Sequence, residues 1–451
     1  MRTLILSVFI AAQATAGQGS MTGLWATDGY GQIFEIAGDS LKSFEITRVS
    51  CIEGETFSAA PAPPNARGAY SLAGTPLVLT ILPDAAGPDS ARVSFGFSAS
   101  DIVIHRIAKK PAACDAPTAN TPRANFDVFT ATFAEHYPFF AERHVDWPAV
   151  VAANRDKITD ATTPRELLAI LAGMIAPMHD PHTGIAATGL GSVRPVRQTP
   201  SFVPAADRQA AYALVTPYLA APLRAFCEGK IEFGLIGADI GYLRIKTFSN
   251  YSKAATFGAD TAELDAALDT IFAGAASWKG LVIDVRLNTG GADPLGLQIA
   301  GRLTPTTYTA YSKQARNAPG DPARWTAPQP SFVRATPRPG FRGPVVELIG
   351  VQSVSAAETF TQALLSRPIK VTRVGENTQG VFSDVLERRL PNGWTFALPN
   401  ERFVTDGKSY DVVGIAPDVF VESLSPAARA TAKDAAIEKA IAIIRGGRAV
   451  P

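Results

Sequence analysis

A serine stands at the junction of a strand pattern and a helix pattern in residues 343–365, GPVVELIGVQSVSAAETFTQALL. The apolar run 345–349 predicts a buried strand and the residues from Ala356 predict a helix, so Ser355 falls at the turn between them. A hydroxyl at such a turn suits a nucleophile, because the first helical N–H groups and the helix dipole point toward it. Ser355 and Glu358 also match a capping box, in which the serine caps the helix and the glutamate reaches back to it. This stretch alone leaves both interpretations open.

A pair of glycines follows a second buried-strand pattern, in LVIDVRLNTGG at residues 281–291. Glycine gives the backbone the freedom to turn its N–H groups toward one point, so Gly290 and Gly291 could line an oxyanion site. A pair of glycines after a strand is also common in ordinary turns, and the pattern alone does not distinguish a turn from an oxyanion site.

Two of the five histidines lie three residues apart in a proline-interrupted turn, PMHDPHTG at residues 177–184. An imidazole titrates near neutral pH, so His179 or His182 could act as a general base, although a turn histidine can equally be solvent-exposed or structural. A metal site built on these histidines and Asp180 lacks a third distant ligand, and we therefore expect no metal and no other cofactor.

The length of the chain predicts two or three domains, and its N-terminal segment predicts an exported protein. The chain has 451 residues, 46% of them hydrophobic, and its net charge of +1 gives no indication of a nucleic-acid partner. Residues 1–16, MRTLILSVFIAAQATA, combine one basic residue, an apolar run and small residues at a cleavage site, which predicts a signal peptide and a periplasmic or secreted protein. No other apolar run reaches the roughly 18 residues of a membrane span, so we expect a soluble mature chain. The oligomeric state is left without a prediction.

Export makes the three cysteines informative, because disulfides form in oxidising compartments. Cys51 and Cys114 fall in the same N-terminal region and could pair, which would be worth on the order of 4 kcal/mol in the chain-entropy model. Cys227 would then be left over, and we expect it to be a small buried hydrophobe rather than a catalytic thiol.

The residue pattern changes several times along the chain. Short alternating runs predict a small antiparallel β module at 17–118, in which we find no chemistry. Helical spacing predicts a helical segment at 122–235, which carries the histidine turn. Strand patterns alternate with helical patterns over 236–425, which predicts an α/β core with a mixed, mostly parallel sheet. The closing segment 426–451 reads as one Ala-rich helix over 427–445.

In this order, the features resemble the C-terminal-processing (tail-specific) serine peptidases, in the branch that contains the tricorn protease core and the interphotoreceptor retinoid-binding protein modules. The resemblance covers about 124–425 and leaves the β module outside. It implies a core of the ClpP/crotonase-like type. The 57 residues between Thr183 and Gly241 are too few for the PDZ module of the processing enzymes. The segments that carry it are Asp180-Pro-His182-Thr, Gly241-Tyr-Leu-Arg-Ile, Asp284-Val-Arg-Leu-Asn-Thr-Gly-Gly291, Ser353-Val-Ser-Ala-Ala-Glu358, Gly375-Glu-Asn-Thr-Gln-Gly380 and Gly414-Ile-Ala-Pro-Asp418.

The resemblance implies a role for each matching residue. Ser355, which begins the S-A-x-E unit, would be the nucleophile, and the backbone N–H groups of Ala356 and of Gly290 or Gly291 would form the oxyanion hole. The bacterial processing enzymes carry a lysine base just after the G-E-x-T-x-G motif. Val381 stands at that position here, which excludes a Ser–Lys dyad.

The tricorn-like branch uses instead the histidine of its D-x-H-T motif, which corresponds to His182. Its acidic partner, usually glutamate, precedes the G-V-x-P-D motif. Asp411 stands there in this chain and is one methylene shorter, so its contact with the histidine could be direct or relayed. Pro181 replaces a serine that helps to orient the histidine in the tricorn-type enzyme.

We therefore predict a serine peptidase that cleaves peptides or unfolded chains through an acyl-enzyme. Ser355 would attack the carbonyl, His182 would take and return the proton, and Asp411 would support the imidazolium. Glu358 is assigned to the helix cap rather than to catalysis. The rival hypothesis is a non-catalytic module that binds apolar ligands or peptides, but a binder has no chemical reason to keep the serine and the histidine. Esterase chemistry on small substrates would use the same residues.

Overall fold

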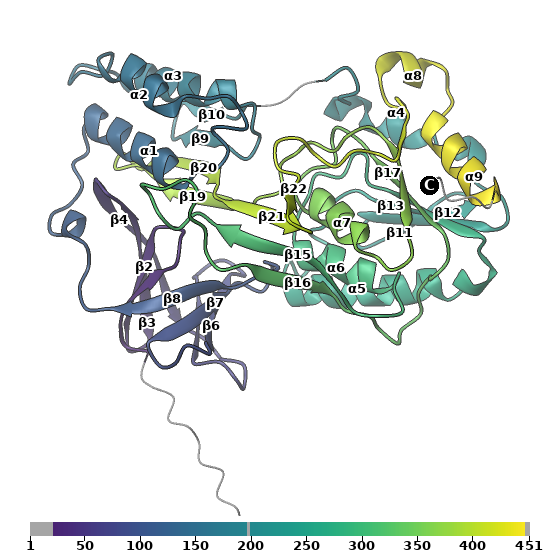
Figure 1. The fold of residues 1–451 in the computed structure, drawn as a ribbon, viewed down its shortest axis with the longest axis horizontal. Coiled ribbons are helices and arrows are strands. Elements are labelled where there is room, and N and C mark those ends of the chain that lie inside the picture. Colours follow the sequence, from purple (N-terminus) through teal and green to yellow (C-terminus); the bar gives the residue numbers. More distant parts are fainter. Residues whose placement is uncertain (1–20, 196–198, 447–451) are drawn as a thin grey trace, which may run out of the picture.

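The computed structural model describes residues 21–195 and 199–446. The predicted signal peptide, residues 1–16, lies outside them. Figure 1 shows a β-barrel, a group of helices above it and a larger α/β layer structure beside both. No helix within the described residues is long and apolar enough to cross a membrane.

The predicted N-terminal β module is confirmed and closes into an eight-stranded antiparallel barrel. Closure follows from the first strand, which pairs on one side with the second strand and on the other with the last. Its interior is filled by apolar side chains such as Trp25, Leu41 and Leu79. The strands are β1 (Gly23–Thr27), β2 (Gln32–Ala37), β3 (Ser40–Thr47), β4 (Ser50–Ala59), β5 (Gly68–Ser71), β6 (Val78–Pro83), β7 (Ser90–Ser94) and β8 (Ile102–Ile107).

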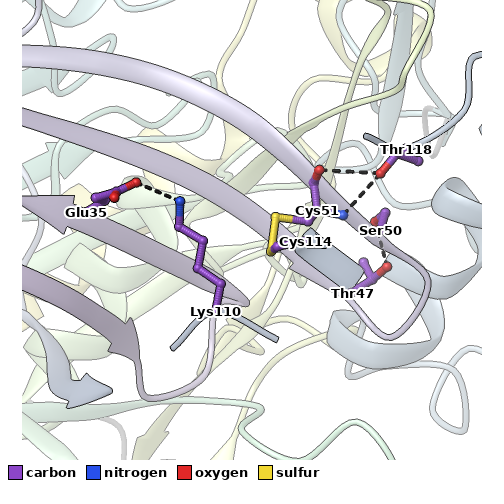
Figure 2. The surroundings of a disulfide bond; sticks show 7 residues. All are labelled: Glu35, Thr47, Ser50, Cys51, Lys110, Cys114 and Thr118. Carbon is purple, nitrogen blue, oxygen red and sulfur yellow. Dashed lines mark hydrogen bonds and ion pairs between the residues drawn. A yellow bond between two sulfur atoms is a disulfide. The ribbon is translucent and has the colours of Figure 1, made fainter. Parts of the chain in front are cut away.

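A disulfide ties the barrel to the segment that follows it. Cys51 in β4 is bonded to Cys114 in the short 3-10 helix η1 (Ala112–Cys114), as predicted (Figure 2). The Cys51 amide also donates to Thr118 Oγ1 at 3.2 Å, so the linker is held against β4 at two points. Cys227 is free and buried, which confirms its expected role as a small apolar residue.

Helices α1 (Pro122–His136), α2 (Trp147–Arg155) and α3 (Pro164–Ile175) follow, as the helical spacing predicts. Helix α3 begins with a capping box, in which the Thr163 hydroxyl accepts from the Glu166 amide and the Glu166 carboxylate accepts from the Thr163 amide. After the histidine turn, β9 (Gly184–Ala187) pairs with β10 (Gly191–Val193) and with β20 (Thr395–Pro399). Because β20 belongs to a much later part of the chain, this pairing brings the turn to the C-terminal half.

The core sheet is mixed and mostly parallel, as predicted. Its first two pairings are antiparallel and the remaining four are parallel. The strands, in spatial order, are β11 (Arg224–Phe226), β12 (Ile231–Ile236), β13 (Ile240–Ile245), β14 (Gly280–Asp284), β17 (Val345–Ile349), β18 (Val371–Gly375) and β23 (Val419–Phe420).

Helices cover both faces of this sheet. Leu281 and Ile283 of β14 pack with α5 (Phe257–Phe272), α6 (Asp293–Gly301) and α7 (Ala356–Leu365). Val282, between them in sequence, packs instead with α9 (Ala435–Gly446), because successive side chains of a strand point to opposite faces. The result is a three-layer α/β/α arrangement (Figure 1).

The single C-terminal helix expected over 427–445 is wrong. The chain forms α8 (Pro426–Ala430) and, after a break, α9. The break occurs because Asp434 turns its carboxylate to buried Arg286 and also accepts from the amides of Ala436 and Ile437, which starts a new helix.

A third sheet lies between the barrel and the core layers (Figure 1). Its strands, in spatial order, are β16 (Gln329–Val333), β15 (Tyr308–Ala315), β21 (Glu401–Thr405) and β22 (Lys408–Ser409). Strand β19 (Val385–Arg389) forms the predicted hairpin with β20. Residues 380–384, just before β19, contact the core through Glu358 of α7 and the barrel through Ser98.

Glu347, in the central strand β17, is a fully buried carboxyl group with one unsatisfied oxygen. Its Oε1 accepts from the Thr361 hydroxyl at 2.8 Å, whereas Oε2 has no partner within the described residues. Burial raises the pKa of Glu347 to about 7. The folded state thus keeps a proton that the unfolded chain, with a pKa of about 4.3, has released.

The free energy of unfolding should therefore fall as the pH rises from about 4 through 7. Glu347→Gln keeps an acceptor for Thr361 and removes the charge, so it should stabilise the protein at pH 8 by on the order of 2 kcal/mol and have little effect at pH 4. Urea denaturation at the two pH values measures this. An equal effect of the substitution at both pH values would contradict the assignment.

Candidate active site

Ser355 lies at the carboxyl edge of the core sheet, between β17 and α7. Its backbone has φ 58° and ψ −123°, a conformation that is rare for a residue other than glycine and costs about 1–3 kcal/mol. The side chain makes no capping hydrogen bond to α7, so the capping-box interpretation is wrong. A strained residue with an unused hydroxyl is typical of a functional position.

Neighbouring groups hold this strained turn in place. The Ser355 amide donates to the Val381 carbonyl at 2.9 Å, and the Ser355 carbonyl accepts from the Glu358 amide at 2.7 Å. Ser353 is fully buried, and its hydroxyl donates to the Val285 carbonyl at 2.8 Å and accepts from the Gly350 amide at 3.1 Å. Ser353 therefore has a structural role, and of the two serines only Ser355 has a hydroxyl without a hydrogen-bond partner in the described part of the chain.

Glu358 does not cap the helix, contrary to expectation. Its carboxylate accepts from the amides of Gly380 at 2.6 Å and Val381 at 2.7 Å. Because the Ser355 amide is already bonded to Val381, the glutamate is free to turn to the opposite segment. Glu358 is completely buried and joins the first turn of α7 to the residues that face the serine.

The glycine turn after β14 lies directly against the serine. A Cβ on Gly290 would stand 2.7 Å from Ser355 Cβ and 3.2 Å from its Oγ, and its φ is 86°. The Gly290 amide is engaged, since it donates to Asn288 Oδ1 at 2.9 Å. The amides of Gly291 and Ala356 have no acceptor among residues 21–195 and 199–446. Of the expected oxyanion donors, Gly291 and Ala356 are thus free and Gly290 is not.

The histidine turn is built by Asp180. One carboxylate oxygen accepts from the His182 amide at 3.0 Å, and the other accepts from the Tyr137 hydroxyl at 2.9 Å and pairs with Arg143 at 3.2 Å. These contacts bury His182, which is 9% exposed, while His179 remains exposed to solvent. Only His182 therefore lies in the interior of the site.

Burial lowers the pKa of His182, although the nearby charge of Asp180 opposes this effect. The imidazole is therefore neutral at pH 7 and able to accept a proton. Its Nδ1 is buried and has no hydrogen-bond partner among the described residues. The same residues contain no group of three or more His, Cys, Asp or Glu side chains that could hold a metal ion.

Asp411 is buried beside the third sheet. Its Oδ2 accepts from the Ser409 hydroxyl at 2.6 Å, and its Oδ1 has no partner within the described residues. Burial raises the pKa of Asp411 to about 7. Within the described residues no hydrogen bond joins His182 to either Ser355 or Asp411.

Residues 380–384, which we call the bridging segment, lie close to all three predicted catalytic residues. The Val381 carbonyl accepts a hydrogen bond from the Ser355 amide. The backbone groups of Phe382 and Ser383 oppose the effect of burial on the pKa of Asp411 and of His182, respectively, which indicates that they lie near these two side chains. In the sequence, this segment stands out only through Val381 at the position of the lysine base, because contacts of backbone groups leave no residue-type signal.

A small cavity with a volume of about 250 Å³ is lined by the residues that directly precede the bridging segment. Val351 lines it from the loop after β17, and residues 376–379 line it from the segment before the bridging segment. Val413 and Phe420 also line it and are 63% and 70% exposed. Two apolar side chains are therefore exposed at this cavity, whose other lining residues include the polar Thr199, Glu376, Asn377, Thr378 and Gln379.

Residues 239–421 match the family model described as peptidase family S41. The chain contains a peptidase family S41 domain. The matched region includes Ser355, both glycines and Asp411, whereas His182 precedes it. The match to this family supports the interpretation of the protein as a serine-type peptidase.

Solved structures agree with this assignment. A putative peptidase from Parabacteroides merdae ATCC 43184 is 26% identical, with a TM-score of 0.62 over 74% of this chain and 100% of that chain. Mature CPAF complexed with lactacystin is 12% identical, with a TM-score of 0.53 over 72% of this chain and 98% of that chain, which indicates similarity of fold alone. No match was found among curated proteins.

Proposed function

We propose that this protein is an exported serine endopeptidase that hydrolyses peptides or unfolded proteins through an acyl-enzyme on Ser355. The observation that carries the proposal is the strained Ser355 turn, which the free Ala356 amide directly follows and against which the Gly290–Gly291 turn lies. The disulfide between Cys51 and Cys114 is consistent with export. The mostly parallel sheet, with the serine at its carboxyl edge, supports a core of the ClpP/crotonase-like type.

The proposed mechanism assigns one task to each group. Ser355 Oγ attacks the peptide carbonyl as neutral His182 accepts its proton, and the imidazolium then protonates the leaving amine. The amides of Ala356 and Gly291 stabilise the oxyanion, each by on the order of 3 kcal/mol. The hydrogen bond from Ser355 to His182 forms when substrate binds, since catalytic hydrogen bonds are often incomplete in free enzymes. Apolar substrate side chains would contact Val413 and Phe420.

Asp411 is proposed to act on His182 through a relay. Each residue has one buried polar atom without a partner among the described residues, Oδ1 of the aspartate and Nδ1 of the histidine. Both also lie against adjacent residues of the bridging segment. A water molecule or a small movement could connect these two atoms.

The two substitutions at Asp411 are expected to differ. Asp411→Asn removes the charge that supports the imidazolium and should lower kcat at least about tenfold. Asp411→Glu adds the missing methylene and should keep or raise kcat. Steady-state hydrolysis of a fluorogenic peptide measures both, with thermal unfolding as the control for folding. An asparagine variant as active as the wild type would remove Asp411 from the catalytic set.

A fluorophosphonate probe tests the proposed function directly. The wild-type protein should label on the peptide that contains Ser355, and Ser355→Ala should abolish labelling and lower protein hydrolysis roughly 10⁴-fold or more. Mass spectrometry of the adduct distinguishes Ser355 from Ser353 in the same peptide. Cleavage of unfolded casein distinguishes a peptidase from an esterase. A folded wild-type protein that neither labels nor cleaves would overturn the proposal and favour a binding protein.

A further inference from the structure

The N-terminal barrel contacts the core at the end of the bridging segment. Ser98, in the barrel loop between β7 and β8, donates its hydroxyl to Asp384 Oδ2 at 3.1 Å. The same hydroxyl accepts from Lys313 Nζ at 2.9 Å. Asp384 is the last residue of the bridging segment, so a barrel side chain directly holds one end of it.

Lys313 is the cation at this junction. It lies on β15 with only 4% of its side chain exposed, and its Nζ is 2.7 Å from Asp384 Oδ2 and 3.1 Å from Glu401 Oε1. Burial alone would lower the pKa of Lys313, but the two carboxylates raise it well above its ordinary value. The lysine therefore keeps its proton, and it makes no hydrogen bond to Ser355 in the described part of the chain.

A second barrel residue reaches the same groups. Tyr30 donates its hydroxyl to Glu401 Oε1 at 2.6 Å, and Glu401 Oε2 accepts from the Asp384 amide at 3.0 Å. Glu401 thus holds the backbone of Asp384, and Lys313 and Ser98 hold its side chain. We call the five residues the junction network: Tyr30, Ser98, Lys313, Asp384 and Glu401.

The bridging segment is held at both ends by buried polar contacts. Glu358 binds the amides at its first end, and the junction network binds Asp384 at its other end. Ser383, whose carbonyl faces His182, directly precedes Asp384. A shift of Asp384 therefore moves a backbone group that lies near the histidine.

We propose that the barrel is required for full catalytic activity. Ser98, Tyr30 and Lys313 are positioning residues that hold the bridging segment against His182. This inference rests on the proposed function and adds a role for the barrel within it. A barrel attached only for stability would need no contact with Asp384. Contacts of that simpler kind also exist, such as the hydrogen bond from Ser331 Oγ to the Ala99 carbonyl at 3.2 Å.

Hydroxyl-deleting substitutions test the positioning role with little change in volume. Ser98→Ala and Tyr30→Phe should each lower kcat about tenfold on a fluorogenic peptide, with KM changed less than twofold, because they disturb orientation and not substrate contacts. Ser98→Thr restores the hydroxyl and should recover most of the rate. Ser331→Ala removes one hydroxyl from the same interface without touching the junction network, and it should hydrolyse at the wild-type rate.

The full-length mature protein is used throughout, with thermal unfolding and fluorophosphonate labelling measured on the same samples. Wild-type rates in both Ser98→Ala and Tyr30→Phe would overturn the proposal, as would an equal loss in Ser331→Ala, since that result indicates general weakening of the interface. A wild-type protein that does not label would contradict the proposed function and the positioning role together. A labelled wild type with unaffected variants would contradict the positioning role alone.

Discussion

Replacing His182 by alanine should lower the rate of Ser355 acylation roughly 10³-fold or more, because His182 is the proposed acceptor of the serine proton. The second-order rate of labelling by a fluorophosphonate measures this step without the complication of product release. The wild-type rate should stay high at the ordinary histidine pKa of about 6.5 and fall only at lower pH, since burial lowers the pKa of His182 and only the neutral form accepts a proton.

His179→Ala is the matched control for this substitution. It removes the other imidazole of the same turn, but from a side chain that is exposed to solvent, so labelling should stay within twofold of the wild type. The His182→Ala protein should remain folded, with a modest loss of stability from the cavity. A folded His182→Ala protein that labels at the wild-type rate would show that another group activates the serine.

Replacing Glu358 by alanine should remove most of the activity and destabilise the fold by roughly 3 kcal/mol or more. The amides of Gly380 and Val381 would both lose their acceptor inside the protein, and each buried unsatisfied amide costs about 1–3 kcal/mol. Without this anchor, the carbonyl that accepts from the Ser355 amide would no longer be held. Urea denaturation and labelling of Ser355, both well below the melting temperature of the variant, measure the two effects.

Glu358→Gln separates positioning from folding. The glutamine keeps one carbonyl acceptor but presents an N–H₂ group to the second amide, so the loss of stability should be smaller than for alanine while labelling should still fall at least tenfold. An alanine variant with wild-type stability and labelling would contradict the role of Glu358. A glutamine variant that is destabilised but labels normally would limit that role to folding.

The sequence by itself determined the parts of the protein that depend on local pattern. Alternating and helical periodicities predicted the antiparallel barrel strands, the mostly parallel sheet and the strand–turn–helix unit at Ser355, since burial of one face imposes these repeats. The capping box at Thr163 and the disulfide between Cys51 and Cys114 also have local or compositional signals. The motif order further predicted His182 and Gly290 or Gly291 as site residues, and these roles stay predictions.

Only the tertiary structure decided which partners the polar groups take. Ser355 and Glu358 have the residue types and spacing of a capping box, yet the serine amide binds Val381 and the glutamate binds the segment opposite. Ser98 and Lys313 gave no signal, because they are 215 positions apart in the chain and their meeting depends on how the barrel packs against the third sheet. A hydrogen bond depends on distance and direction in the folded chain, and residue spacing constrains these only within one element.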